Sequence, residues 1–196
     1  RVCHRNGMLL LVDNAHGAYL HFLEESRHPI ALGASMCCDS AHKTLPVLTG
    51  GAYLHIASAM ESLFVPQVKN ALALFGSTSP SYLILQSLDA ANAYLAEYPD
   101  KLSSLIPRLN VLKDAIKDAG YALVGQEPLK ITVSAKGYGY LGTDLADILR
   151  ENNLECEFSD PDFVVMMFTP ENAHAIKNVT ARLCSVKKRA AIEELP

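Results

Sequence analysis

Three apolar segments with strand-like patterns occupy the first third of the chain. The first is a continuous apolar run, Met8 to Val12, that ends in Asp13, and such a run is typical of a buried strand in a parallel sheet. Two further strands are predicted at Ala34 to Asp39 and at Gly51 to Ala57. Functional groups in open α/β sheets gather at the carboxyl ends of the strands. Asp13 and the Ser40–Lys43 segment both occupy such positions.

Helical patterns follow in the middle of the chain. A short helix is predicted over Gln67 to Phe75, closed by Gly76. Ser79 has the residue type of an N-cap and Pro80 that of a first helical position. The two should therefore begin a helix over Ser81 to Glu97, where leucine and alanine recur at roughly helical spacing.

A further helix is predicted from a cap at Asp100 to about Ala119, with Pro99 ending the helix before it. Gly120 suits the position just after this helix, because glycine readily adopts the left-handed conformation found there. Pro107 should kink or break the helix, since proline has no backbone N–H to donate and crowds the preceding turn.

The pattern changes again at about residue 126, where short strands alternate with helices. The predicted elements are strands at Leu129–Ser134, Glu155–Phe158 and Phe163–Phe168, and helices at Gly142–Asn152 and Glu171–Lys188. The sequence thus predicts an α/β protein with a sheet-containing part over 1–88, connecting helices over 89–125, and a small α/β domain over 126–196.

Composition and charge narrow the function classes. The chain has 196 residues, of which 49% are hydrophobic and 19% charged, with a net charge of -4 and a pI near 6.0. These values are ordinary for a globular protein and give no reason to expect nucleic acid or an anionic membrane as a partner. The longest apolar runs are far too short to span a bilayer.

The cysteines and the first residue give two further expectations. None of the five cysteines forms a C-x-x-C pair, so we expect no disulfide framework and no metal site, and reduced thiols in the cytoplasm are the default. The chain opens with Arg1 and runs almost directly into an apolar strand. We therefore expect it to be a fragment of a longer polypeptide.

Two short constellations carry groups suited to chemistry. Asp13-Asn14-Ala15-His16-Gly17 follows the first predicted strand, and Ser40-Ala41-His42-Lys43-Thr44 follows the second. Either alone is weak, because a strand commonly ends in a capping acid and most lysines are surface residues. Together they supply an acid, two imidazoles, a hydroxyl and an amine at two strand ends. Catalysis with pyridoxal 5'-phosphate (PLP) requires such a set, including a lysine for a covalent imine and an acid for the pyridine nitrogen.

These motifs resemble those of the fold-type-I ornithine/lysine/arginine decarboxylases. The resemblance rests on Val12–Ala18 (VDNAHGA) and Asp39–Pro46 (DSAHKTLP), and on Leu48–His55 (LTGGAYLH) and Ser77–Tyr82 (STSPSY) with Asp89-Ala-Ala91. It extends over nearly the whole chain. It implies the C-terminal part of a fold-type-I, aspartate-aminotransferase-like PLP domain followed by a small α/β C-terminal domain.

The resemblance also implies a role for each motif residue. Asp13 would pair with the pyridine nitrogen, Ala15 would pack on the ring, His16 would reach the phenolic oxygen, Ser40 and His42 would bind phosphate, and Lys43 would form the Schiff base. Ser77, Thr78 and Ser79 would lie in a loop at the dimer interface, near the partner's phosphate. The implied reaction is decarboxylation of ornithine, lysine or arginine, and the implied assembly is a homodimer or larger. His16 or Lys43 would return the proton to Cα.

Some features depart from the family, and other readings stay open. Asn14 stands where the family usually has an acid, Tyr19 where a histidine is frequent, and Gly50 where a glutamine is frequent. A glycine hydroxymethyltransferase or related aldolase carries similar Asp-x-Ala-His and His-Lys-Thr-Leu patterns. The chain by itself is alternatively an inactive dimerising piece of the parent enzyme.

Overall fold

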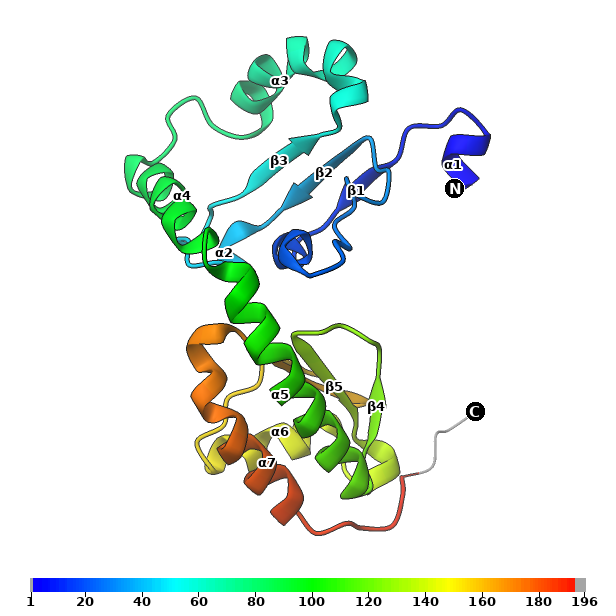
Figure 1. Ribbon diagram of the computed structural model, residues 1–196. Helices are drawn as coiled ribbons and strands as arrows, with labels where there is room; N and C mark the ends of the chain where they lie inside the picture. Colours follow the sequence, from blue (N-terminus) through cyan, green and yellow to red (C-terminus); the bar gives the residue numbers. More distant parts are fainter. Residues whose placement is uncertain (1, 193–196) are drawn as a thin grey trace. The chain divides into compact units, whose positions relative to one another are not determined.

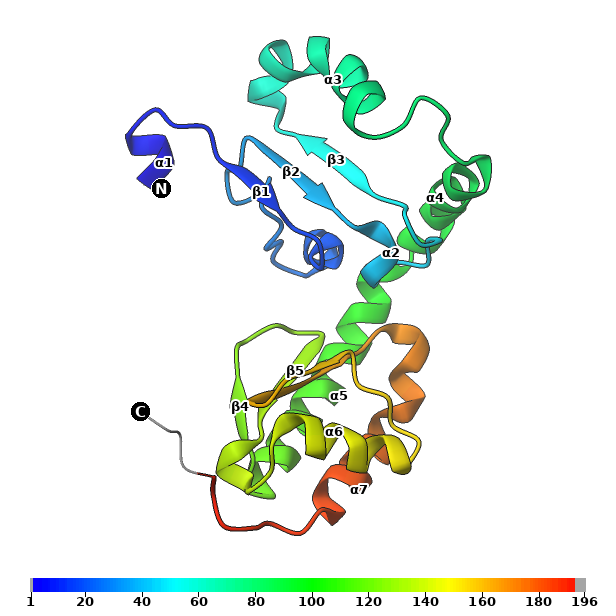
Figure 2. The same cartoon turned by 180° about the vertical axis from the view of Figure 1, so that it is seen from behind.

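The computed structural model describes residues 2–192 of the chain (Figures 1 and 2). They form two compact units, which divide after Asp100. We call residues up to Asp100 the N-terminal unit and residues from Lys101 the C-terminal unit, and we describe each by itself. The connecting segment expected over 89–125 is shared between the two. Among the described helices, none is long and apolar enough to cross a membrane.

The N-terminal unit is built on a three-stranded sheet of order β1-β2-β3. Its elements are α1 (Val2–Arg5), β1 (Leu11–Asp13), the 3-10 helix η1 (Ala18–Phe22), β2 (Met36–Asp39), α2 (Ala41–Thr44), β3 (Tyr53–Ile56), the 3-10 helix η2 (Ser58–Met60), α3 (Glu61–Phe75) and α4 (Tyr82–Leu95). Strands β1 and β2 are parallel, with Asp13 opposite Cys38. Strand β3 runs antiparallel to β2, with His55 opposite Cys37.

The first strand differs from the prediction in length and burial. The predicted six-residue run is a strand only over Leu11–Asp13, and Leu11 is 58% exposed rather than buried. Strand β1 lies at the edge of the sheet among the described residues and pairs on one side with β2. The continuous apolar run therefore predicted the strand correctly but did not predict that the strand is exposed.

The helix boundaries correct several expectations about proline and serine. Helix α3 begins at Glu61 and continues through Pro66. Helix α4 begins only at Tyr82, with Ser81 as its N-cap, so the cap predicted at Ser79 was wrong. Its backbone explains the shift, because Ser81 has the extended conformation (φ -65°, ψ 122°) that precedes a helix.

Helix α5 (Tyr98–Asp118) contradicts the break expected at Pro107 and the start expected at Asp100. Pro99 lies in its first turn, where a missing backbone N–H has no partner to lose. Pro107 stays within the helix, whose apolar face is deeply buried at Leu105, Leu109 and Leu112. We infer that this burial outweighs the one hydrogen bond that proline removes.

The C-terminal unit contains a four-stranded antiparallel sheet of order β4-β5-β7-β6. Beyond α5 its elements are β4 (Ala122–Val124), β5 (Lys130–Ser134), the 3-10 helix η3 (Lys136–Tyr138), α6 (Gly142–Glu151), β6 (Phe158–Ser159), β7 (Phe163–Met167), the 3-10 helix η4 (Pro170–Ala175) and α7 (Ile176–Ser185). Alternate residues of β5 and β7 are buried, so one face of this sheet is covered. Strand β4 was not predicted, and the last predicted helix is divided between η4 and α7.

Gly120 ends α5 as predicted. Its φ of +96° is left-handed, and the Tyr121 N–H donates back to the Ile116 carbonyl at 3.2 Å, as expected for a glycine-terminated helix. The Tyr121 ring then stacks on Tyr138, with centroids 3.7 Å apart. Both hydroxyls donate to main-chain carbonyls, of Leu183 and Val186. These aromatic groups therefore hold the last turn of α7 and the residue that follows it.

Candidate functional site

The two motif segments lie together at one end of the N-terminal sheet. Asp13 is the last residue of β1, and the Asn14 N–H donates to the Cys38 carbonyl of β2 at 2.8 Å. Ser40 follows β2 directly and precedes the single turn α2, which contains His42 and Lys43. Because β1 and β2 are parallel neighbours, the groups after each strand share one edge of the sheet, as expected for a ligand site in this class of fold.

The turn that contains Lys43 is held from several sides. His42 donates to the Gly51 carbonyl twice, from its backbone N–H at 3.3 Å and from ring nitrogen Nδ1 at 3.1 Å. The Tyr98 hydroxyl donates to the Thr44 carbonyl at 3.2 Å. Gly51 is required by close approach, since a Cβ there would lie 2.3 Å from Val47 Cγ1. Lys43 itself is half-buried, so its turn is fixed while its side chain keeps access to solvent.

The remaining sequence-predicted residues differ in their surroundings. Asp13 is exposed, and Ala15, His16 and Ser40 are half-buried. Ser77, Thr78 and Ser79 lie in an exposed segment between α3 and α4. The Ser79 N–H donates to Ser77 Oγ at 3.0 Å, so this segment forms a small turn of its own.

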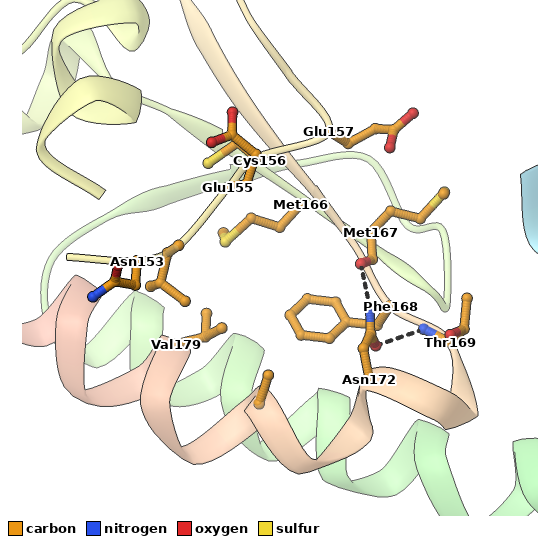
Figure 3. Close-up of a pocket in the computed structure, with 12 residues that line it drawn as sticks. Asn153, Glu155, Cys156, Glu157, Met166, Met167, Phe168, Thr169, Asn172 and Val179 are labelled. Atoms are coloured by element: carbon orange, nitrogen blue, oxygen red, sulfur yellow. Dashed lines mark hydrogen bonds between the residues drawn. The ribbon is translucent and has the colours of Figure 1, made fainter. Parts of the chain in front are cut away.

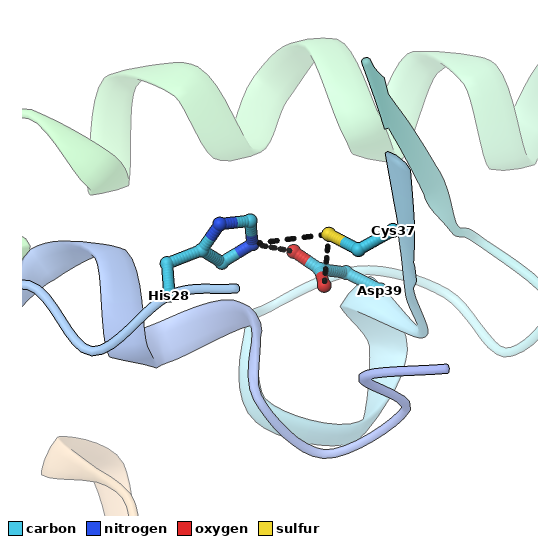
Figure 4. A group of neighbouring side chains, drawn as sticks. All are labelled: His28, Cys37 and Asp39. Atoms are coloured by element: carbon cyan, nitrogen blue, oxygen red, sulfur yellow. Dashed lines mark hydrogen bonds and ion pairs between the residues drawn. The ribbon is translucent and has the colours of Figure 1, made fainter. Parts of the chain in front are cut away.

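Sequence reasoning missed a polar cluster around the buried Asp39, which we call the Asp39 cluster (Asn14, His28, Cys37, Asp39 and His55). Asn14 Nδ2 donates to Asp39 Oδ1 at 2.7 Å, and His28 Nε2 lies 2.9 Å from Oδ2. His55 Nε2 lies 3.0 Å from the same Oδ2. Asp39 is only 2% exposed. Figure 4 shows His28 and Cys37 pointing at its carboxylate.

Electrostatics keep Asp39 charged. Burial by itself raises the pKa of this carboxyl, but its polar neighbours His55, Asn14 and His28 outweigh burial and lower the pKa to about 2. Cys37 shows the opposite effect, since burial and the adjacent Asp39 charge raise the pKa of its thiol to about 12. Near neutral pH the cluster therefore contains one carboxylate and a protonated thiol.

The ligand atoms of His28, Cys37 and Asp39 lie within 4.8 Å of one another, close enough to suggest a metal site. The hydrogen bonding favours a different interpretation. The Ile30 N–H donates to Nδ1 of His28 at 3.3 Å, so the neutral ring has its proton on Nε2 and donates it to Asp39. A metal ligand would need that nitrogen unprotonated. The group is best described as a hydrogen-bond network.

A hollow of ≈ 440 Å³ in the C-terminal unit also contains acidic groups (Figure 3). Glu155 is already paired, since Arg150 Nε donates to both its oxygens at 3.2 and 3.1 Å. Burial, aided by the Glu155 charge, raises the pKa of Cys156 to about 11. Because the thiol is then protonated near neutral pH, the hollow has no activated nucleophile there.

Comparison with protein families and curated relatives identifies what the chain is similar to. Residues 1–135 match the family model described as Orn/Lys/Arg decarboxylase, major domain. Protein YaaO of Bacillus subtilis is 36% identical over 84% of this chain and 36% of its own length. An arginine decarboxylase of B. subtilis is 32% identical over 86% of the chain and 37% of its own length. The chain thus spans little more than a third of these relatives.

Solved structures show the same fold at lower identity. The lysine decarboxylase LdcF of Francisella novicida matches with a TM-score of 0.72 and 18% identity, over 89% of this chain and 32% of that one. Lysine decarboxylase A of Pseudomonas aeruginosa matches with a TM-score of 0.69 and 17% identity, over the same shares of the two chains.

Proposed function

The chain belongs to the Orn/Lys/Arg decarboxylase family, and we propose that the full protein uses PLP to decarboxylate a basic amino acid. One observation supports this most directly: Asp13 and the Ser40–Lys43 turn follow two paired parallel strands and so share one edge of the sheet. Bound PLP supplies an electron sink for the electrons left when carbon dioxide departs. The donor set of these two segments fits such a cofactor.

The proposed roles follow from the chemistry of each side chain. The Asp13 carboxylate would hold a proton on the pyridine nitrogen, since an adjacent negative charge favours the charged ring. Lys43 would provide the amine that binds the cofactor covalently. Ala15 is small enough to pack against a flat ring, and His16 would donate to the phenolic oxygen.

The phosphate would be held by Ser40 and His42. Nδ1 of His42 donates to the Gly51 carbonyl, so Nε2 would donate to the phosphate from the doubly protonated ring. The Ser40 hydroxyl sits at the start of the same turn. A short and a long side chain from one segment would thus both donate to the phosphate, which suits an anion with several oxygens.

The substrate class is tested by offering the full protein ornithine, lysine and arginine, each labelled in its carboxyl carbon. We expect labelled carbon dioxide from at least one of them, because relatives named for arginine and for lysine both match this chain. An enzyme that instead cleaves serine or threonine between Cα and Cβ, and releases no carbon dioxide, would establish the aldolase alternative.

We also propose that the protein works as a homodimer or a larger assembly. Helices α3 and α4 present an unusual number of exposed apolar side chains for a free surface, namely Leu63, Val65, Leu72, Leu74, Phe75, Tyr82, Leu83 and Leu85. Surfaces of this kind are usually buried by association, and a symmetric pair is the commonest solution. Ser77–Ser79 lies between these helices and would come close to the partner's phosphate.

Light scattering of the full protein at micromolar concentration should report at least a dimer. Leu83→Glu, on the exposed side of α4, should shift the protein toward monomer because it places a charge in a buried interface. Val111→Glu, equally exposed at 70% but on α5, is the matched control and should leave the assembly unchanged. A monomeric wild-type protein would contradict the assembly.

The cytoplasm is the compartment that we propose. All five cysteines are free thiols, and two of them, Cys38 and Cys184, are exposed. Exposed unpaired thiols are typical of proteins kept in a reducing environment.

A further inference from the structure

The Asp39 cluster is placed where it connects the two strand ends of the proposed active site. Asn14 follows Asp13 directly, and Asp39 precedes Ser40 directly. The 2.7 Å hydrogen bond from Asn14 Nδ2 to Asp39 Oδ1 therefore joins the segment of Asp13 to the segment of Lys43 by side chains, in addition to the main-chain bond from Asn14 to Cys38. Of these side chains, Asp39 is nearly inaccessible to solvent.

The other oxygen of Asp39 is also fixed. Oδ2 accepts from His28 Nε2 at 2.9 Å, and the His28 ring is itself held by the Ile30 N–H. His55 Nε2 lies 3.0 Å from the same oxygen. The carboxylate is therefore held by three separate parts of the chain: the segment after β1, the segment between η1 and β2, and strand β3. A buried charge with both oxygens engaged has little freedom to rotate, and networks of this kind make a local structure rigid.

We propose that Asp39 is a positioning residue, which through Asn14 sets Asp13 in its place relative to Lys43. The inference rests on the proposed function, since it gives Asp39 a purpose in that same site. Displacing a reacting group by about 1 Å can lower a rate by about 10². In this role the carboxylate acts by holding its neighbours.

The structure suggests an exchange experiment, because Asn14 and Asp39 are a donor and an acceptor that can trade places. Asn14→Asp alone removes one of the donors that lower the Asp39 pKa and sets two acids at hydrogen-bond distance, so the amide-to-carboxylate bond is lost and the two acids either repel each other or share one proton. The double variant Asn14→Asp/Asp39→Asn restores one amide and one carboxylate: the amide now at position 39 donates to the new acid and still accepts from His28. Asp39→Asn alone leaves two amides, one of which can turn to accept.

We expect Asn14→Asp to lower kcat of the folded, cofactor-loaded protein roughly 10²-fold, with KM little changed, and to alter the absorbance of the bound cofactor. The double variant Asn14→Asp/Asp39→Asn should regain most of the kcat and most of the cofactor absorbance. Asp39→Asn alone should not raise kcat above that of the wild-type protein. Denaturant unfolding should show the same compensation. The control Asn178→Asp adds the same charge at an exposed position on α7 and should change none of these quantities.

Two results would overturn the positioning role. If the double variant is no better than Asn14→Asp in kcat and in cofactor absorbance, the two side chains do not act as a pair on the site. If denaturation is rescued but kcat and absorbance are unaffected by any variant, Asp39 serves stability alone. Failure of the proposed function has a different signature: wild-type protein would bind no PLP and release no carbon dioxide, while the unfolding data still report the side-chain tie.

Discussion

Lys43→Ala is expected to abolish decarboxylation by the full protein. Lys43 follows β2 within a turn that His42, Gly51 and Tyr98 hold in place, and a cofactor-binding lysine needs such a fixed backbone with a free amine. Losing an essential nucleophile costs other enzymes up to about 10⁶ in kcat. We therefore expect a loss on the order of 10⁴-fold or more, with PLP retained only weakly, as measured by carbon dioxide release and by absorbance after gel filtration.

A chemical test identifies the lysine independently of activity. Borohydride reduction of the PLP-loaded protein, followed by peptide mapping, should find the cofactor on Lys43. Lys69→Ala is the matched control, because Lys69 is exposed on α3 and its removal should leave both activity and labelling intact. Labelling mainly at Lys69, or at Lys130, which is paired with Glu127, would show that the lysine assignment is wrong.

The sequence predicted the elements around the site well because its signals are local. Apolar runs marked β1 and β2, and the acid at the end of one and the lysine turn after the other could be read directly. That the two strands are parallel was also expected. The fold class, an α/β chain like the C-terminal part of a fold-type-I decarboxylase, agrees with the likeness to the lysine decarboxylase structures.

The Asp39 cluster could not be predicted, because it depends on contacts that sequence patterns do not encode. His55 reaches Asp39 only because β3 runs antiparallel in a register that sets His55 opposite Cys37. His28 reaches Asp39 from the irregular segment between η1 and β2. Hydrophobic periodicity does not predict the path of such a segment. The sequence did contain a weaker signal. Cys37 and Asp39 are two residues apart in a strand and so lie on the same face, and a buried acid on that face requires polar partners.

The edges of helices were misjudged where several capping residues compete. Ser77, Ser79 and Ser81 are all suitable N-caps by residue type, and the Ser-Pro pair favoured the wrong one. Pro107 was misjudged for another reason, since the penalty for an interior proline is local whereas the leucines that bury α5 are spread along its length. Local rules therefore fail where tertiary burial decides.

Asp13→Asn is expected to leave PLP bound while lowering the rate strongly. Asparagine keeps the shape and the hydrogen-bonding capacity of the side chain, but without a negative charge it no longer favours a protonated pyridine ring. Asp13 is exposed at the end of β1, so the change should cost little folding stability. We expect kcat to fall roughly 10²–10³-fold, the scale on which a single preorganised electrostatic group acts in other enzymes.

Asp118→Asn, exposed at the end of α5, removes the same charge as a control and should have no effect. Cofactor absorbance, unfolding midpoint and carbon dioxide release together separate these effects. Near-normal turnover in Asp13→Asn would mean that a different acid holds the pyridine nitrogen, or that the chemistry does not need one.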